Sequence, residues 1–220
     1  MRLFCWITHF VHAEGLENIP KEGGYLICAN HRGMADPLCV ACYLPECPFF
    51  MAKEELFHVP LLRRIIRYAH AFPVKRGTSD IASVQESVKI LREGKNLLVF
   101  PEGTRSKTGA PGEPKPGVAM LAARSGCDVL PCAVCYKGKA GVFRKMTVRF
   151  GPVIHNEELN LKEGRRSEAY TRGANRIMDA IVSMLPEVNG KKVRAPRHIH
   201  RLGRLARKAG KTEQTGEEVR

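Results

Sequence analysis

Short apolar runs recur between residues 24 and 150 of the chain, and segments with helical spacing separate several of them. The runs are Tyr25–Ala29, Phe49–Ala52, Ala71–Val74, Asn96–Phe100, Val129–Val134 and Met146–Phe150. Strand-like runs that alternate with helical segments are typical of a mostly parallel sheet. The pattern therefore predicts an α/β fold in which a mostly parallel central sheet is flanked by helices. The last run, Met146–Phe150, alternates apolar and polar residues, so we predict it as an exposed edge strand.

Three helices are predicted from apolar residues that recur at helical spacing. One begins after Asp80 or Ser79 and stops at Gly94, the second covers Pro60–Tyr68, and the third covers residues 166–185. The second is amphipathic and basic, with Arg63, Arg64 and Arg67 among its apolar residues. Its charged face is expected to meet solvent, an acidic carrier or lipid.

The length of 220 residues and the 44% of hydrophobic residues suit one buried core rather than two. We divide the chain into an N-terminal apolar segment (1–14), a folded domain (15–188) and a basic, flexible C-terminal tail (189–220). No apolar stretch approaches the ~20 residues that a transmembrane helix needs. The apolar residues of the N-terminal segment either pack on the core or contact a membrane surface.

The chain carries a formal net charge of +14, because 36 Lys and Arg residues outnumber 22 Asp and Glu residues. Such a charge attracts polyanions: nucleic acid, anionic lipid headgroups or acidic carrier proteins. Neither a helix-turn-helix signature nor an aromatic-rich strand supports nucleic acid as the partner. The basic tail is either a solvated element or a surface-binding one.

The eight cysteines include two C-x-x-C pairs, Cys39/Cys42 and Cys132/Cys135, which raise the possibility of a zinc site. Several of the cysteines lie in apolar runs, where a thiol behaves as a small hydrophobic group, and no histidine lies at a supporting short spacing. We therefore predict no metal site. In the absence of a signal peptide, reduced thiols in a cytoplasmic protein are the simpler interpretation.

The first candidate for chemistry is the segment Asn30–Pro37, which directly follows the run Tyr25–Ala29 and contains His31 and Asp36. A turn through Gly33 would fold the carboxylate of Asp36 back to His31. The carboxylate could then accept the Nδ1 proton and leave Nε2 free to take a proton from a hydroxyl. The alternative is that Asp36 only caps the next helix.

Charged residues follow three further runs. Phe100–Arg105 offers a carboxylate, a glycine, a hydroxyl and a guanidinium, a set suited to phosphate and hydroxyl groups, although it could also be an ordinary turn. Lys75 and Arg76 follow Ala71–Val74, and Lys53 follows Phe49–Ala52. Each of these cations, taken alone, would be interpreted as a solvated surface residue. However, ligands of open α/β sheets bind at the carboxyl ends of strands, and all of these cations are predicted to lie there.

These motifs together resemble those of the glycerolipid acyltransferases. The ordered elements are N-H-x-x-x-x-D, V-K-R-G, F-P-E-G-T-R and the apolar strand Val129–Val134, and the similarity is greatest to the bacterial 1-acyl-sn-glycerol-3-phosphate acyltransferases, over about Gly15–Ile154. The resemblance implies a glycerol-3-phosphate acyltransferase-like fold, with His31 as the general base and Asp36 as its orienting partner. It also implies that glycerol phosphate is bound by Arg76, Glu102, Gly103, Thr104 and Arg105, with Lys53 and Lys75 as further ligands.

The function that this resemblance implies is the transfer of a fatty acyl group from acyl-CoA or acyl carrier protein to the 2-hydroxyl of lysophosphatidate. The product would be phosphatidate, a step of phospholipid biosynthesis that needs no metal or other cofactor. We expect the enzyme to bind peripherally to an anionic membrane at its cytoplasmic face, without a transmembrane span and without nucleic acid. The alternatives are another acceptor, such as glycerol 3-phosphate or another lysolipid, and a non-catalytic protein that binds anionic lipid.

Overall fold

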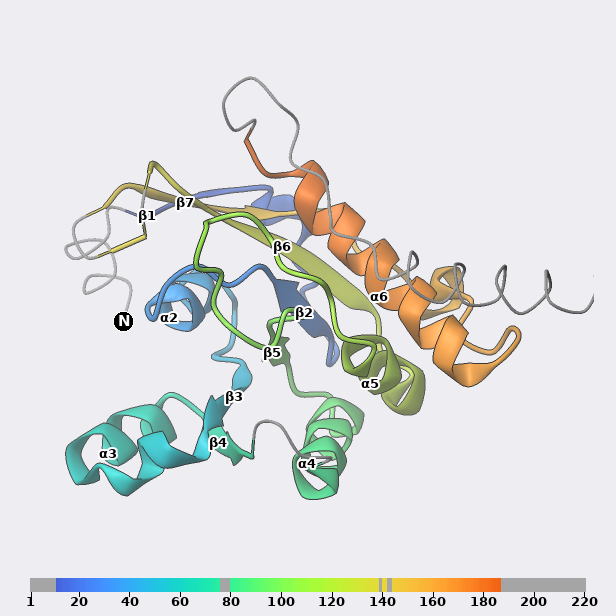
Figure 1. The fold of residues 1–220 in the computed structure, drawn as a ribbon, viewed down its shortest axis with the longest axis horizontal. Helices are drawn as coiled ribbons and strands as arrows, with labels where there is room; N and C mark the ends of the chain where they lie inside the picture. The colour runs from blue at the N-terminus through green and yellow to red at the C-terminus, as the bar shows by residue number, and fades with distance from the viewer. Residues whose placement is uncertain (1–10, 76–79, 139, 142–143, 187–220) are drawn as a thin grey trace, which may run out of the picture.

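The structure, a computed structural model, describes residues 11–75, 80–138, 140–141 and 144–186. A twisted sheet forms the centre of the molecule, and helices cover its two faces (Figure 1). The strands are β1 (Val11–Glu14), β2 (Leu26–Ala29), β3 (Phe49–Lys53), β4 (Ala71–Val74), β5 (Leu97–Val99), β6 (Val129–Tyr136) and β7 (Met146–Phe150). The α-helices are α2 (Asp36–Ala41), α3 (Pro60–Tyr68), α4 (Ile81–Arg92), α5 (Gly117–Ser125) and α6 (Arg166–Ser183). Three 3-10 helices join them: η1 (Leu16–Asn18), η2 (Glu54–His58) and η3 (Asn156–Leu159).

The strands of the sheet lie in the order β1-β7-β6-β2-β5-β3-β4. Of the paired strands, β6 and β7 run antiparallel, whereas all the other neighbours are parallel. The prediction of an α/β fold with a mostly parallel sheet is therefore confirmed. Because β6, β2, β5, β3 and β4 are parallel neighbours, their carboxyl ends meet at one edge, where ligands of such sheets bind.

The prediction that Met146–Phe150 is an exposed edge strand is wrong. β7 lies between β6 and β1, and its side chains Met146, Val148 and Phe150 are buried. The alternation arises because one face of β7 packs on the core while Thr147 and Arg149 on the other face are only partly covered. The edge strand on this side of the sheet is β1, which is formed by residues at the end of the N-terminal apolar segment. The rest of the N-terminal apolar segment and the tail from residue 189 lie outside the described residues.

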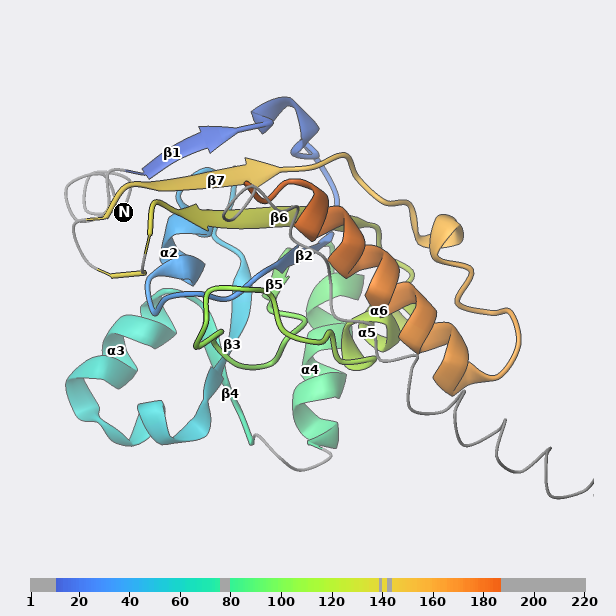
Figure 2. The same ribbon diagram turned by 45° about the horizontal axis from the view of Figure 1, so that its top comes forward.

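Two layers of core side chains sandwich the sheet, because successive residues of each strand point to opposite faces. In β2, Leu26 and Cys28 pack with α4, α5 and α6, whereas Ile27 and Ala29 pack with α2. Figure 2 shows α4, α5 and α6 together on the first face. Because both faces of the sheet are packed against helices, the strands hold the loops at the carboxyl edge in fixed positions.

The helices largely agree with their predicted positions. The Asp80 carboxylate caps α4 by accepting a hydrogen bond from the backbone N–H of Ser83, and the chain leaves this helix through Gly94 at φ +76°. α3 has the predicted bounds, yet none of its residues is buried. α5 was not predicted, since its short Ala-rich sequence has no cap residue before it. Within the described ranges, none of the helices combines the length and the apolar character that a bilayer span requires.

Candidate active site

The loop after β5 holds the backbone of His31, which follows β2 at the carboxyl edge of the sheet. The backbone N–H of His31 donates to Glu102 Oε1 (2.8 Å), and its carbonyl oxygen accepts from the backbone N–H of Ser106 (2.8 Å). The preceding residue, Asn30, is buried and forms two side-chain hydrogen bonds with the backbone of Val134 in β6. Three neighbouring strands therefore fix the position of His31.

The side chains of His31 and Asp36 form a hydrogen-bonded pair. His31 Nδ1 lies 2.9 Å from Asp36 Oδ2, and the same oxygen accepts from the backbone N–H groups of Arg32 (2.6 Å) and Gly33 (2.7 Å). Backbone N–H groups can only donate, so Oδ2 is an acceptor and the proton of the imidazole resides on Nδ1. The neutral ring consequently carries its lone pair on Nε2, the form that a general base requires.

Asp36 is more than the plain helix cap of the alternative interpretation. It occupies the first turn of α2, the N-cap is Ala35, and no side chain caps the helix. The carboxylate is completely buried and turns back to the segment 31–33 instead. A buried carboxylate without donors would be costly, and these hydrogen bonds offset that cost.

Tyr136, at the end of β6, supplies a further donor to Asp36 and was not identified from the sequence. Its hydroxyl donates to Asp36 Oδ1 over 2.7 Å. Burial, together with the negative charge of Asp36, raises the pKa of the Tyr136 phenol far above its usual range, so the phenol keeps its proton and remains a donor. A Cβ at Gly33 would lie 2.6 Å from this hydroxyl oxygen, which explains why a glycine stands there.

Replacing Tyr136 with phenylalanine should lower the free energy of unfolding by about 1–3 kcal/mol, because one oxygen of a buried carboxylate loses its donor. Chemical denaturation followed by fluorescence would measure this change. Tyr43→Phe is the matched control, since the Tyr43 hydroxyl donates to the carbonyl of Val11, away from His31. Only Tyr136→Phe should also slow catalysis. Unchanged stability and turnover in Tyr136→Phe would refute the role given to this hydroxyl.

Glu102 binds the protein's own backbone in the structure. Its Oε1 accepts from His31 N–H, and its Oε2 accepts from the N–H of Gly112 over 2.7 Å. The side chain is buried, and this burial raises the pKa of its carboxyl group. Through these two hydrogen bonds, Glu102 connects the long loop 103–117 to the backbone of His31. Its described contacts make it a positioning residue, and its predicted contact with substrate stays a prediction.

The other predicted ligands lie around the same edge of the sheet. Gly103 lines the cavity described below, Thr104 and Arg105 are exposed on the loop that is bonded to the His31 backbone, and Lys75 lines the cavity from the end of β4. Lys53 ends β3 and forms an ion pair with Glu55 (2.8 Å), so its charge is partly engaged. Arg76 lies outside the described residues.

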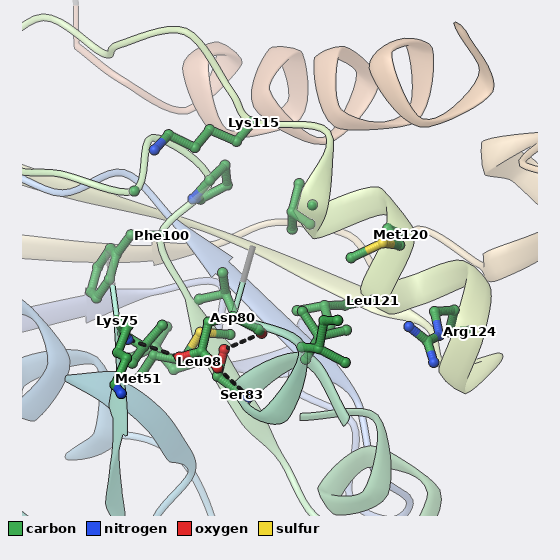
Figure 3. Close-up of a pocket in the computed structure, with 18 of the residues that line it drawn as sticks. Met51, Lys75, Asp80, Ser83, Leu98, Phe100, Lys115, Met120, Leu121 and Arg124 are labelled. Carbon is green, nitrogen blue, oxygen red and sulfur yellow. Dashed lines mark hydrogen bonds between the residues drawn. The ribbon is translucent and has the colours of Figure 1, made fainter. Parts of the chain in front are cut away.

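A cavity of about 510 Å³ opens beside His31 and runs between the sheet and the helices α4 and α5 (Figure 3). Its walls are mainly apolar: Met51, Val74, Ile81, Val84, Leu98, Val99, Phe100, Val118, Met120 and Leu121. The His31 ring stacks on Phe100 with 4.0 Å between ring centroids, and it is 9% exposed. The volume of the cavity falls within the ~300–1,000 Å³ that is typical of binding sites for small ligands. The cavity therefore offers an apolar ligand direct access to the ring.

Cations surround the apolar part of the cavity. Lys75, Lys115 and Arg124 all line it, and Figure 3 shows them on different sides of it. Lys115 was not identified from the sequence, where it lies between two prolines of the long loop. Its side chain passes over Gly103, because a Cβ built there would lie 3.0 Å from Lys115 Nζ. The site thus combines a base, an apolar chamber and several positive charges.

The cysteines of the two C-x-x-C pairs are buried in the core, as expected for small hydrophobic side chains. Among the described residues, no three His, Cys, Asp or Glu side chains are grouped closely enough to hold a metal ion.

Known proteins resemble this chain in sequence and in fold. Residues 10–135 match the family described as Acyltransferase. The 1-acyl-sn-glycerol-3-phosphate acyltransferase of Bacillus subtilis is 28% identical over 78% of this chain and 88% of its own length. The enzyme of the same name from Borreliella burgdorferi is 34% identical over 60% of this chain, which spans only 54% of that protein. The crystal structure of the 1-acyl-sn-glycerophosphate acyltransferase PlsC from Thermotoga maritima superposes with a TM-score of 0.63 and 28% identity, covering 82% of this chain and 72% of that one.

The fold and the hydrogen-bonded pair of His31 and Asp36 beside an apolar cavity suit an enzyme that activates a hydroxyl group. With more than half of its length matched, the chain belongs to the acyltransferase family. The relatives named above carry the name of one activity within that family, the acylation of 1-acyl-sn-glycerol 3-phosphate.

Proposed function

We propose that the protein transfers a fatty acyl group from an acyl thioester to the 2-hydroxyl of 1-acyl-glycerol 3-phosphate and so produces phosphatidate. The observation that carries this proposal is that His31, paired with Asp36, lines an apolar cavity that cations also line. An acyl chain matches the apolar walls, and a phosphate matches the cations. The names of the relatives identify the acceptor.

In the proposed reaction, Nε2 of neutral His31 takes the proton of the 2-hydroxyl while its oxygen attacks the thioester carbonyl carbon. A C–O bond forms, the C–S bond breaks, and the departing sulfur takes the proton back from the imidazolium. The products are the ester and a free thiol, and His31 returns to its neutral form. This sequence of steps uses no metal and no prosthetic group. General base catalysis of this kind contributes ~10²–10⁴-fold to the rate.

Asp36 supports each step from behind the ring. Its hydrogen bond to Nδ1 holds the ring in one tautomer and in one orientation, and its negative charge stabilises the imidazolium that forms. The backbone contacts from Glu102 and Ser106 to His31 keep the ring from moving away from the cavity. Such positioning lowers the entropic part of the barrier.

We assign the phosphate of the acceptor to the cations at the carboxyl edge. Arg105, with Gly103 and Thr104 next to it, is the main candidate, and Lys53, Lys75 and Arg76 are further ones. Lys115 joins this group because its amine lies over Gly103. A guanidinium binds a phosphate through two parallel hydrogen bonds, which would also orient the glycerol.

The acyl donor, as we propose it, is acyl-CoA or acyl carrier protein. Both are anionic, and the net charge of +14 would attract either of them. The acceptor is a lipid, so we further propose that the protein binds peripherally to the cytoplasmic face of an anionic membrane.

The test is to incubate the purified protein with lysophosphatidate and each thioester donor while the free thiol is measured. Thiol release that depends on lysophosphatidate, together with phosphatidate among the extracted lipids, is the expected result. Glycerol 3-phosphate and lysophosphatidylcholine serve as comparison acceptors. Faster release with one of them would move the assignment to that acceptor. Binding of anionic lipid without any thiol release would favour the non-catalytic alternative.

A further inference from the structure

The segment from η2 to the end of α3 exposes an unusual number of apolar side chains. Among the described residues, eight large hydrophobic side chains are exposed, and five of them lie within residues 56–68. We call these five the α3 patch: Leu56, Val59, Leu61, Ile65 and Tyr68. Leu61 is 73% exposed and Tyr68 is 89% exposed. Clustered apolar exposure of this kind marks an interaction surface rather than chance.

The outward side of α3 is apolar in its own right. Leu61, Ile65 and Tyr68 are spaced by four and three residues, so they lie on one side of the helix. The inward side is formed by Leu62 and Ile66, which are partly buried, and Ile66 packs against the core. Anchoring α3 to the sheet therefore requires only the inward residues. The outward apolar row needs another explanation.

Within α3, all the charged residues are positive. Pro60–Tyr68 contains Arg63, Arg64 and Arg67, which are exposed, and no acidic residue. In η2, the carboxylate of Glu55 is paired with Lys53. An apolar row accompanied by arginines complements a surface that is anionic at its boundary and apolar beneath it.

The α3 patch and the cavity lie on opposite faces of the same two strands, β3 and β4, at one edge of the sheet. Ile66 of α3 packs with the α2 face of the sheet, whereas Met51 and Val74 line the cavity on the α4 side. η2 starts directly after Lys53 at the carboxyl end of β3, and Lys53 pairs in register with Val74 of β4. Val74 and the exposed Lys75 both line the cavity that reaches His31. In Figures 1 and 2, α3 projects at the far end of the molecule from α6, with β3 and β4 beside it.

We propose that the α3 patch docks the protein on an anionic lipid bilayer and so brings β3 and β4, whose residues Met51 and Val74 line the cavity, close to the membrane surface. The proposal rests on the proposed function, because a lipid acceptor must leave the bilayer to reach His31. A lipid surface fits better than a partner protein, because the arginines beside the apolar row match anionic headgroups and because acyl chains adapt to the convex surface of a helix. Tyr68 suits this depth because its ring is apolar and its hydroxyl is polar.

The first test removes the apolar row. Leu61→Ser/Ile65→Ser/Tyr68→Ser should bind phosphatidylcholine vesicles that contain phosphatidylglycerol at least ~10-fold more weakly than the wild type, as measured by co-sedimentation. Leu16→Ser is the control, because Leu16 is 48% exposed and lies in η1 after the opposite edge strand. This control should bind like the wild type. Equal binding by the triple variant and the wild type would overturn the proposal.

The second test removes the charges. Arg63→Gln/Arg64→Gln/Arg67→Gln should reduce binding to the same anionic vesicles ~100-fold, because each basic side chain near such a surface contributes about fivefold to the affinity. Lys162→Gln/Arg165→Gln/Arg166→Gln removes three exposed charges in the turn before α6 and at its first residue, and is the matched control. If both variants lose binding equally, net charge rather than the α3 patch drives docking, and the proposal fails.

A third measurement separates docking from catalysis. With a short-chain lysophosphatidate that stays monomeric in water, the apolar triple variant should turn over like the wild type, and it should be slow only with acceptor embedded in vesicles. A protein that binds vesicles through the α3 patch yet acylates neither acceptor would refute the proposed function and leave docking intact. Two other results would identify a different occupant of the α3 patch. If light scattering shows that the wild type is a dimer and that the triple variant is not, a second copy of the chain occupies the patch. If the variant keeps its affinity for vesicles but loses affinity for acyl carrier protein, the carrier protein occupies the patch. Either result would overturn docking on lipid.

Discussion

Replacing His31 with alanine is expected to lower the turnover of acyl transfer by at least ~100-fold, since the reaction loses the base that takes the proton from the acceptor hydroxyl. Thiol release under saturating donor and acceptor would measure this loss. The affinity for lysophosphatidate should change much less, because the phosphate ligands remain. The fold should also survive, because the His31 backbone, rather than its ring, carries the hydrogen bonds to Glu102 and Ser106.

His155→Ala offers a closely matched control for this experiment. His155 also pairs through Nδ1 with a carboxylate, that of Asp128, and the distance is again 2.9 Å. The His155 side chain is 65% exposed, and it is not among the residues that line the cavity. Its removal should leave turnover unchanged. A His31→Ala variant that transfers acyl groups at the rate of His155→Ala would show that the assigned base is wrong.

Replacing Asp36 with asparagine is expected to slow turnover by ~10²–10⁴-fold, a loss similar in kind to that of the base itself. The amide oxygen can still accept from Nδ1 of His31 and from the backbone N–H groups, while the amide nitrogen can donate to the Tyr136 hydroxyl. The shape of the site is thereby kept, and the negative charge that stabilises the imidazolium is lost. The free energy of unfolding should fall by about 1.5–3 kcal/mol, because the hydrogen bonds lose their charged acceptor.

Asp128→Asn is the corresponding control, since it removes the charge from the exposed pair with His155. Stability in this control should change little because solvent screens the interaction, and turnover should not change at all. Comparing the two Asn variants isolates the contribution of a buried charge next to the reacting ring. Turnover in Asp36→Asn equal to that in Asp128→Asn would mean that the carboxylate only supports the fold.

Much of the sheet could be predicted from local pattern, because a strand that is buried on both faces must be a continuous apolar run. β4 and β7 have their predicted bounds, and β2, β3, β5 and β6 differ only at their ends. The pairing of strands depends on contacts between distant segments, which local pattern does not contain. Taken by itself, the sequence Met146–Phe150 alternates as an edge strand does. Only the pairing of strands shows that β1 lies next to β7 and forms the edge of the sheet.

The proposed catalytic pair could be predicted from the sequence for a related reason. His31 and Asp36 are five residues apart, so a single turn brings them together, and the resemblance to a family identified the same two residues. Tyr136 and Lys115 are 100 and 79 positions from Asp36 along the chain, and nothing in their local sequence points to a site. Glu102 was found as a motif residue, yet its motif did not reveal that its partners are backbone N–H groups.

The sequence by itself determined the class of fold, the identity of the candidate base and its carboxylate, and the basic, amphipathic character of residues 60–68. These properties reside in short segments, where residue type and spacing suffice. Only the tertiary structure decided that the carboxyl ends of β2, β5, β3 and β4 form one edge, and that Tyr136 completes the hydrogen bonding of Asp36. It also decided which side of α3 faces outward, because burial is set by the neighbours that a residue meets after the chain has folded.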